Sequence, residues 1–211
     1  FYLGVKSVCD SATMEVKYTN SWASFDLEKE CAEQLIADGC VLISQHADTT
    51  GAPTACEAKK VPCVGYNIDM IPTAPDAALT SATINWGPYY TYAVQSVIEG
   101  TAIDTDWSKG VKDGADAITE LNDKTVAKGT KEKVEEAQKG IEDGTIHVFD
   151  TSKFTVGGKT LEELVESGDE DATKLQSYIK DGYFHESDVA GGMTSAPAFT
   201  FIIDGIDSIT K

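Results

Sequence analysis

The chain is 211 residues long, with 41% hydrophobic and 25% charged residues, a composition typical of one globular domain or two small lobes. It carries 35 acidic residues against 17 basic ones, and its net charge of -18 opposes binding to a nucleic-acid backbone or an anionic membrane surface. We therefore expect no nucleic-acid partner.

All basic residues are lysines, because the sequence contains no arginine. Bidentate guanidinium pairs with a carboxylate or phosphate are therefore unavailable, and a neutral or cationic ligand fits the chain better than an anionic one. The five cysteines all lie within the first 63 residues and show no CxxC spacing. This pattern argues against a zinc site or a complete disulfide framework, and we expect small core residues.

Apolar patterns predict alternating helices and strands in the first hundred residues. In chain order, they predict a helix at 1–10, a strand at 14–19, a helix at 26–39, a strand at 40–45, a helix at 52–60, strands at 61–69 and 79–86, and a helix at 87–99. This order is typical of a doubly wound α/β fold with a parallel sheet and right-handed crossovers.

The second half of the chain has a different rhythm, with shorter elements and more charge. The sequence predicts short strands within 110–122, a charged helix at 125–144, a hairpin turn at Gly157–Gly158, an acidic helix at 160–182 and one or two terminal strands within 198–209. No stretch approaches the roughly 20 apolar residues needed to cross a bilayer.

Aromatic and short polar side chains follow four predicted strands. Ligands bind beyond the carboxyl ends of the strands in an open parallel sheet, and rings with amide or carboxylate groups suit a flat heterocycle. A tryptophan can also fill a core, and asparagine or aspartate can cap a helix, but four strand ends agree. The candidate ligand-binding residues are Asn20, Trp22, His46, Asp48, Asn67, Asp69 and Trp86, with Asn85 beside the last.

Catalytic and metal sites have weaker support. The sequence contains neither a GxSxG elbow nor a P-loop, and its three histidines are scattered. Cys56, His46 and Asp48 could form a nucleophilic group, but nothing in their spacing specifies one. We expect no catalytic residue, no metal and no cofactor.

Four segments together resemble a known family: Y-x-N-S-W, Q-H-x-D, G-Y-N-x-D-M and N-W-G-P-Y-Y, in this order within residues 1–150. They are similar to the basic membrane protein family of substrate-binding lipoproteins of ABC importers, and most similar to its purine-binding branch. The resemblance implies a periplasmic-binding-protein type I-like fold, in which two α/β lobes close on a purine base or nucleoside.

The resemblance also implies an organisation and a location. Most of this chain would be the second lobe, with the first lobe and the lipid-carrying cysteine ahead of Phe1. The protein would be extracytoplasmic, with an ABC permease as partner and with membrane contact only through that absent anchor. The expected units are a second-lobe core at 1–85, a helix returning to the first lobe at 86–100, the remainder of the second lobe at 101–150, and an extension with crossing strands at 151–211.

The resemblance assigns roles to particular residues. Trp22 would stack on the purine, and Asp69 would hydrogen-bond it beside Asn67. Asp48 lies in a loop that is Gly-rich in the nucleoside-binding branch of the family and reads H-x-D in the other branch. A free base and a nucleoside therefore both stay open as the ligand.

Two rival functions also remain: a nucleoside-processing enzyme with Asp69 as general base, and a ligand-sensing regulatory domain.

Overall fold

The structure is a computed structural model that describes residues 1–185 and 199–209. Its helices are α1 (Tyr2–Lys6), α2 (Phe25–Ala37), α3 (Gly51–Lys59), α4 (Gly87–Glu99), α5 (Thr130–Asp143), α6 (Leu161–Glu166) and α7 (Glu170–Leu175). Its strands are β1 (Met14–Lys17), β2 (Ile43–Ser44), β3 (Cys63–Tyr66), β4 (Ala78–Ile84), β5 (Asp116–Ile118), β6 (Ile179–Lys180), β7 (Tyr183–Phe184) and β8 (Ile206–Ile209).

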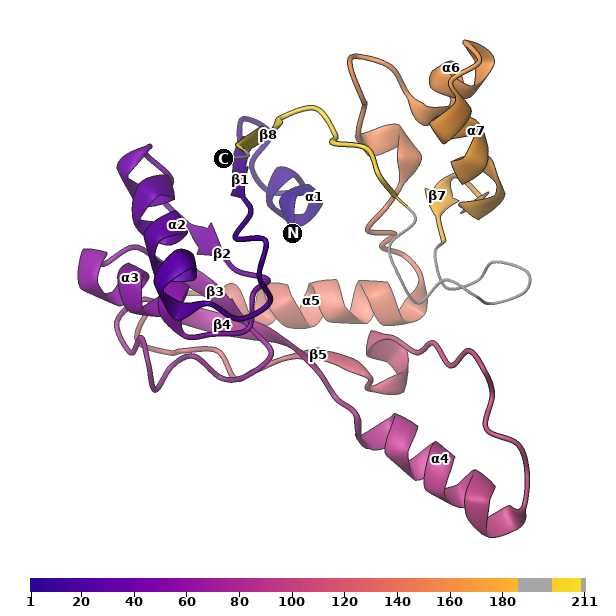
Figure 1. Cartoon of the computed structure of the whole chain (residues 1–211), viewed down its shortest axis with the longest axis horizontal. Coiled ribbons are helices and arrows are strands. Elements are labelled where there is room, and N and C mark those ends of the chain that lie inside the picture. Colours follow the sequence, from indigo (N-terminus) through magenta and orange to yellow (C-terminus); the bar gives the residue numbers. More distant parts are fainter. Residues whose placement is uncertain (186–198, 210–211) are drawn as a thin grey trace.

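A four-stranded sheet in the order β2-β3-β4-β5 forms the centre of the fold. The strands β2, β3 and β4 are parallel, whereas β5 runs antiparallel to β4. Helix α3 connects β2 to β3, and α2 and α3 lie together beside the sheet (Figure 1). The predicted α/β fold is confirmed, with one antiparallel strand added at the edge.

Close packing of α2 on α3 depends on a glycine. A Cβ atom at Gly51, the first residue of α3, would collide with the carbonyl oxygen of Phe25, the first residue of α2. Only a residue without a side chain allows this approach. The main core then forms between these helices and the sheet, and its buried members are Ala32, Ile43, Ala52, Ala55, Cys56, Cys63, Met70, Ala74, Ala77 and Ala78.

The cysteine prediction is right for Cys56 and Cys63, which belong to this core. Cys31 and Cys40 are half-buried, and Cys9 is exposed, so the prediction is wrong for Cys9. The helix expected at 1–10 already ends at Lys6, so Cys9 lies in the loop that follows α1.

Strand β1 does not join the four-stranded sheet. It pairs in parallel with β8, with Met14 opposite Ile206. A second core forms on this side of the molecule, built from Tyr2, Phe154, Leu161 and Ile203. Residues from both ends of the chain therefore pack together, and α5 leads from the sheet toward the part that carries α6 and α7 (Figure 1).

Two other predicted elements are wrong in length. The strand expected at 40–45 is reduced to β2, because the N–H of Cys40 still donates to the carbonyl of Leu35 at the end of α2, 3.0 Å away. Between 110 and 122, the only strand is β5, preceded by a 3-10 turn at Val111–Asp113.

The acidic helix expected at 160–182 is in fact two short helices and a hairpin. A capping box at Thr160 begins α6, Gly168 adopts a left-handed φ of 82°, and the side chain of Asp169 caps α7. The β6–β7 hairpin then turns at Asp181 and Gly182, which also have positive φ. The turn at Gly157–Gly158 is confirmed by the bridge between Val156 and Lys159.

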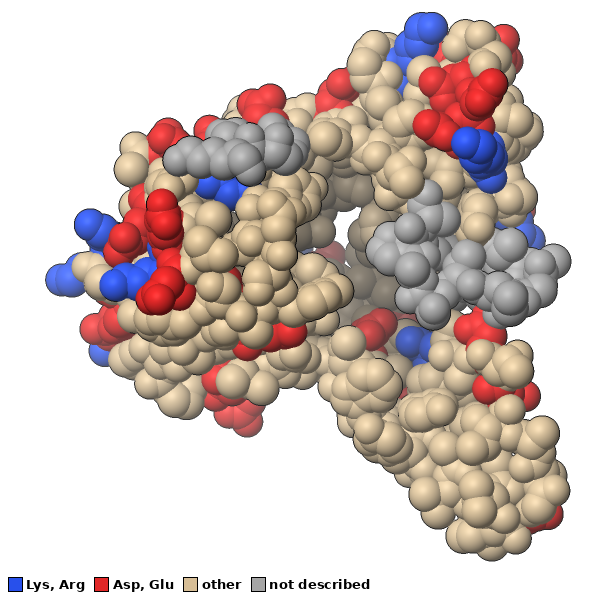
Figure 2. Space-filling model, viewed as in Figure 1, with Lys and Arg blue, Asp and Glu red and all other residues tan. Residues whose placement is uncertain are grey.

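Helix α4 extends away from the rest of the molecule (Figure 1). Figure 2 shows few charged side chains over this helix, whose single charged residue is Glu99. None of the helices within the described residues is long and apolar enough to span a bilayer.

Candidate functional site

The loops that follow β1, β2 and β3 bring four of the predicted site residues together. The amide of Asn67 donates to Oδ1 of Asp48 at 3.1 Å, and the backbone N–H of Asp48 donates to the carbonyl of Trp22 at 2.8 Å. The rings of Trp22 and His46 have centroids 6.5 Å apart. His46, Asp48 and Asn67 follow the neighbouring strands β2 and β3, as the strand-end argument predicted, whereas Trp22 follows β1, which pairs with β8 outside this sheet.

The indole of Trp22 is open to solvent, with 75% of the residue exposed. It is therefore not a core plug, which was the structural alternative for this tryptophan. An exposed aromatic face can stack on a flat ring, and carboxylate and amide groups from the adjoining loops can bind the edge of that ring.

Tyr66 is a site residue that the sequence analysis missed. It is the last residue of β3, and its ring lies 4.8 Å from that of His46, centroid to centroid. Its position directly before Asn67 could have identified it, but the strand expected at 61–69 placed Tyr66 inside the strand and not at its end. His46 therefore lies between Trp22 and Tyr66 in a run of aromatic rings.

The backbone at Asn67 turns sharply to present its side chain. Its φ is 72°, in the left-handed region that asparagine tolerates better than most residues. Its N–H donates to the carbonyl of Ala82, and its own carbonyl accepts from the hydroxyl of Thr83, each at 2.8 Å. Because both partners lie on β4, the end of β3 is anchored to the neighbouring strand. Asn20 also has positive φ, at 52°.

Two polar side chains fix the loop that carries His46 and Asp48. The amide nitrogen of Gln45 donates to the carbonyls of Ala47 and Thr49, at 2.8 and 2.9 Å. Glu28 of α2, which is 4% exposed, accepts from the N–H and the hydroxyl of Thr49 with Oε2. Its Oε1 accepts from the N–H of Ser24. Glu28 thus ties the loop after β1 to the loop after β2, a role that no local sequence pattern reveals.

Asp69 lies at the same strand end but is held differently. Its Oδ1 accepts a hydrogen bond from the N–H of Ile71 at 2.9 Å, a local turn contact. Asp48 and Asp69 are both exposed, and neither forms an ion pair with a lysine in the described part of the chain. Their carboxylates therefore remain accessible to N–H or O–H donors of a ligand.

Trp86 is not brought to the Trp22 group. Its ring contacts Tyr89 and Tyr90 of α4, with centroids 6.5 and 6.1 Å apart, and none of the ring contacts between described residues joins it to Trp22 or His46. Asn85 uses its amide to hold Gly114 and to accept from the N–H of Gly87. The fourth strand end thus forms a separate aromatic group at the start of α4.

The hypothesis that Cys56, His46 and Asp48 form a nucleophilic group is wrong. Cys56 is 0% exposed in the main core, whereas His46 and Asp48 are exposed at the loop, so a substrate could not reach the sulfur there. Across residues 1–185 and 199–209, no group of three or more His, Cys, Asp or Glu side chains is arranged to hold a metal ion.

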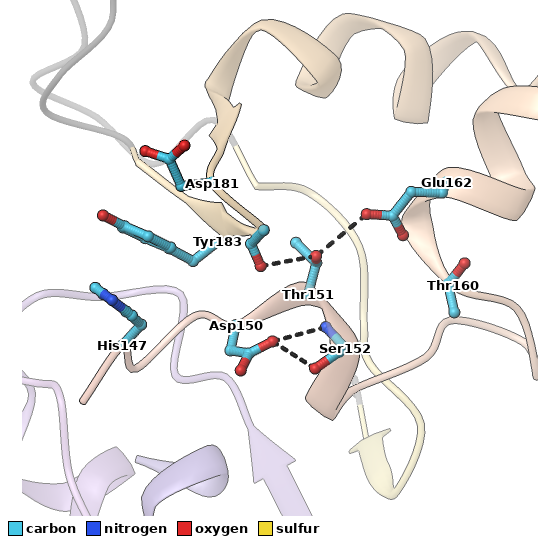
Figure 3. Close-up of a pocket in the computed structure, with 9 residues that line it drawn as sticks. His147, Asp150, Thr151, Ser152, Thr160, Glu162, Asp181 and Tyr183 are labelled. Carbon is cyan, nitrogen blue, oxygen red and sulfur yellow. Dashed lines mark hydrogen bonds between the residues drawn. The ribbon is translucent and has the colours of Figure 1, made fainter. Parts of the chain in front are cut away.

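A hollow of about 410 Å³ lies in the C-terminal part, away in sequence from the Trp22 group (Figure 3). The ring of His147 stacks on that of Tyr183 at 3.7 Å. Hydrogen bonds from Ser152 occupy Oδ1 of Asp150 and lower its pKa, and the hydroxyl of Thr151 lies 3.2 Å from Glu162. Because Asp150, Thr151 and Ser152 are engaged in hydrogen bonds within the chain, we do not take this hollow as the candidate site.

Comparisons with known proteins place the chain among ABC transporter components. Residues 1–150 match the model of the Bmp family, described as ABC transporter substrate-binding protein PnrA-like. A purine-binding protein from Brucella abortus is 31% identical over 149 residues, which cover 71% of this chain and 42% of that protein. A protein from Haloferax volcanii, named provisionally as an ABC transporter glucose-binding protein, is 29% identical over 72% of this chain and 39% of its own length.

A solved structure has the same fold. The solute-binding protein of an ABC transporter system from Conexibacter woesei superposes with a TM-score of 0.54 at 19% identity, covering 69% of this chain and 49% of that one. The chain thus spans about two fifths of the length of the curated relatives it matches.

Proposed function

Because the chain belongs to the Bmp family of PnrA-like ABC transporter substrate-binding proteins, we propose that it is part of an extracytoplasmic solute-binding protein that binds a purine base or nucleoside without catalysis. The observation that carries the ligand class is the exposed indole of Trp22 on a backbone that is hydrogen-bonded to Asp48, whose side chain in turn pairs with Asn67. The relative named as a purine-binding protein supports the same class.

In this proposal Trp22 stacks on the ligand, and Asp48, Asn67 and Asp69 bind its edge. A base stacked on an aromatic side chain gains about 1–3 kcal/mol, and a hydrogen bond to a charged group contributes about 1.5–3 kcal/mol. After ordering costs, such terms give an affinity of micromolar order. Tighter binding requires a second wall that excludes water.

Helix α4 is the proposed link to that second wall. Tyr90, Val94, Val97 and Ile98 lie on one face of it and are between 58% and 74% exposed. We assign 86–100 to a helix that returns to the first lobe of a family-length protein, because most of this apolar face is open to solvent. Residues 1–85 and 101–150 would then form the second lobe, with 151–211 as an extension.

The partner in this proposal is an ABC permease, to which the closed protein delivers its ligand. Attachment to the membrane would be through an N-terminal lipid anchor outside this chain. The carboxylates at the site and the net charge of -18 fit a ligand that offers N–H and O–H donors and carries no negative charge.

Calorimetric titration with adenine, guanosine, inosine and glucose tests the ligand class. We expect binding of at least one purine compound, and a loss of about 5- to 150-fold in Trp22→Ala because the stacking term of about 1–3 kcal/mol is removed. Trp22→Phe should retain part of the affinity. Trp107→Ala is the matched control, because Trp107 packs on Tyr89 and Tyr92 away from the site.

Two results would contradict the proposal. Unchanged affinity of Trp22→Ala for every ligand would remove the stacking role, and binding of glucose alone would replace the purine class with the sugar class of the Haloferax relative. Release of free base from inosine, measured by chromatography, would favour the nucleoside-processing enzyme instead.

A further inference from the structure

Two cysteine side chains meet inside the main core. Cys56 lies in α3 and Cys63 is the first residue of β3. They are 0% and 2% exposed and belong to the same buried cluster. The proposed function makes no use of this pair, which is separate from the exposed ligand site.

The connection between the two cysteines is short and well fixed. Lys60 ends α3 in a left-handed conformation with a φ of 56°, and the N–H of Val61 donates to the carbonyl of Cys56 at 3.0 Å. The chain therefore reverses direction directly after the helix. This reversal places β3 in contact with α3, so that Cys56 and Cys63 face the same buried core.

We propose that Cys56 and Cys63 form a disulfide site, oxidised by a small-molecule disulfide such as oxidised glutathione. The thiolate of one cysteine attacks a glutathione sulfur, and one reduced glutathione leaves with the cysteine's proton. The second cysteine then attacks the mixed disulfide, and a second reduced glutathione leaves with its proton. Two protein thiols and one oxidised glutathione thus give one protein disulfide and two reduced glutathiones.

Burial determines when this reaction takes place. The interaction between the two thiols raises the pKa of Cys56 and lowers that of Cys63. In the folded protein glutathione cannot reach either sulfur, because the residues are 0% and 2% exposed. Oxidation should therefore occur during folding, before the core closes, and the finished bond should resist reduction. An extracytoplasmic compartment favours such oxidation. The oxidation of the pair does not depend on whether the protein binds a purine.

The bond would join elements that carry the candidate site. Helix α3 follows the loop with His46 and Asp48, and β3 ends at Tyr66, directly before Asn67. Linking Cys56 to Cys63 would hold these two segments in their observed register. It closes a short loop, and loops of this size raise the melting temperature of a protein of this length by about 5–10 °C.

Peptide mapping tests the proposal directly, because Lys59 and Lys60 lie between the two cysteines. Trypsin therefore separates Cys56 from Cys63 unless a disulfide joins them. The chain is unfolded in reductant, refolded with a tenfold excess of oxidised glutathione, alkylated and digested without reduction. To remove other pairings, the same experiment is done on the variant with Cys9→Ser, Cys31→Ser and Cys40→Ser.

We expect the peptides 30–59 and 61–109 to be joined, with a mass two hydrogens below their sum, and to separate on reduction. The oxidised form should melt about 5–10 °C above the reduced one, and Cys56→Ala with Cys63→Ala should abolish this redox difference. Alkylated Cys56 and Cys63 after oxidative refolding, or a bond from Cys63 to Cys31 or Cys40 in the unmodified chain, would overturn the proposal. Neither readout involves ligand, so failure here leaves the proposed function untouched.

Discussion

Oε2 of Glu28 accepts two hydrogen bonds from Thr49, one from its N–H at 3.1 Å and one from its hydroxyl at 2.7 Å. This buried carboxylate joins α2 to the loop that carries His46 and Asp48. Because Oε1 accepts from the N–H of Ser24, Glu28 faces donors on both oxygens. It is a positioning residue for the candidate site, since it holds both loops and is itself only 4% exposed.

Glu28→Gln should therefore destabilise the protein. In glutamine an NH2 group replaces one of the two carboxylate oxygens. This NH2 group would face a donor of Ser24 or Thr49 and could not accept from it. Leaving such a buried group unpaired costs about 1–3 kcal/mol, which urea unfolding measures as a lower free energy of unfolding. Glu33→Gln on the same helix is the control: its exposed pair with Lys29, at 4.0 Å, should change stability by less than about 1 kcal/mol. Equal stability of both variants would contradict the positioning role.

Asn67 offers a test that separates its backbone from its side chain. Asn67→Gly and Asn67→Ala both remove the hydrogen bond to Asp48, but only alanine is strained at a φ of 72°. The alanine variant should be less stable than the glycine variant by about 1–2 kcal/mol, measured by denaturant unfolding. Both should weaken purine binding to a similar extent. Full affinity in the glycine variant would show that the amide does not contribute to binding.

Asp204 should make the C-terminal part of the fold sensitive to acid. Hydrogen bonds from Thr155, Gly158 and Gly157 lower its pKa below the ordinary value of 3.8. Because the folded pKa lies below the unfolded one, the carboxylate stabilises the folded state above the unfolded pKa. This stabilisation is lost as the pH falls through the folded pKa.

Thermal unfolding between pH 2 and pH 7 measures the effect of Asp204. Asp204→Asn should melt at a lower temperature than the unmodified protein at neutral pH, and the two curves should converge as the pH falls through the folded pKa of Asp204, which is below 3.8. Asp207→Asn, a neighbouring acid on β8, serves as control and should follow the unmodified protein. A constant difference between Asp204→Asn and the unmodified protein at all pH values would exclude the titration of Asp204 as its cause.

The apolar face of α4 predicts that the cost of polar substitutions on it depends on whether the first lobe is present. Val97 and Ile98 are 69% and 74% exposed, so Val97→Asp with Ile98→Asp should leave the stability of this chain within about 1–1.5 kcal/mol, from helix propensity and from the negative charges added in the last turn of α4. In a family-length protein that buries the same face, the substitutions should cost about 3 kcal/mol or more. The measurement is urea unfolding of both forms. Val8→Asp, at an 86% exposed position, is the control, and equal effects in both forms would contradict the proposed docking.

The sequence was most informative where the structure is local. The rhythm of helix and strand, the turn at Gly157–Gly158 and the polar residues at strand ends depend on neighbours along the chain, and these predictions agree with the structure. Errors arose where a local pattern continued past a stop signal. The acidic stretch at 160–182 has helical composition throughout, yet the left-handed backbone at Gly168 divides it.

The sequence by itself determined the α/β class, the family and the proximity of His46, Asp48 and Asn67, because the parallel strands β2 and β3 bring their carboxyl ends to one edge of the sheet. Trp22 lies beside them although its strand, β1, is not part of that sheet. Only the tertiary structure decided that β1 pairs with β8, that Tyr66 completes the aromatic run, that Glu28 fixes the loops and that Trp86 lies in another group. Each of these contacts depends on which residues distant along the chain meet in space, or on how a side chain is oriented. Hydrophobic periodicity describes which face of an element is buried, but it does not specify the partner buried against it.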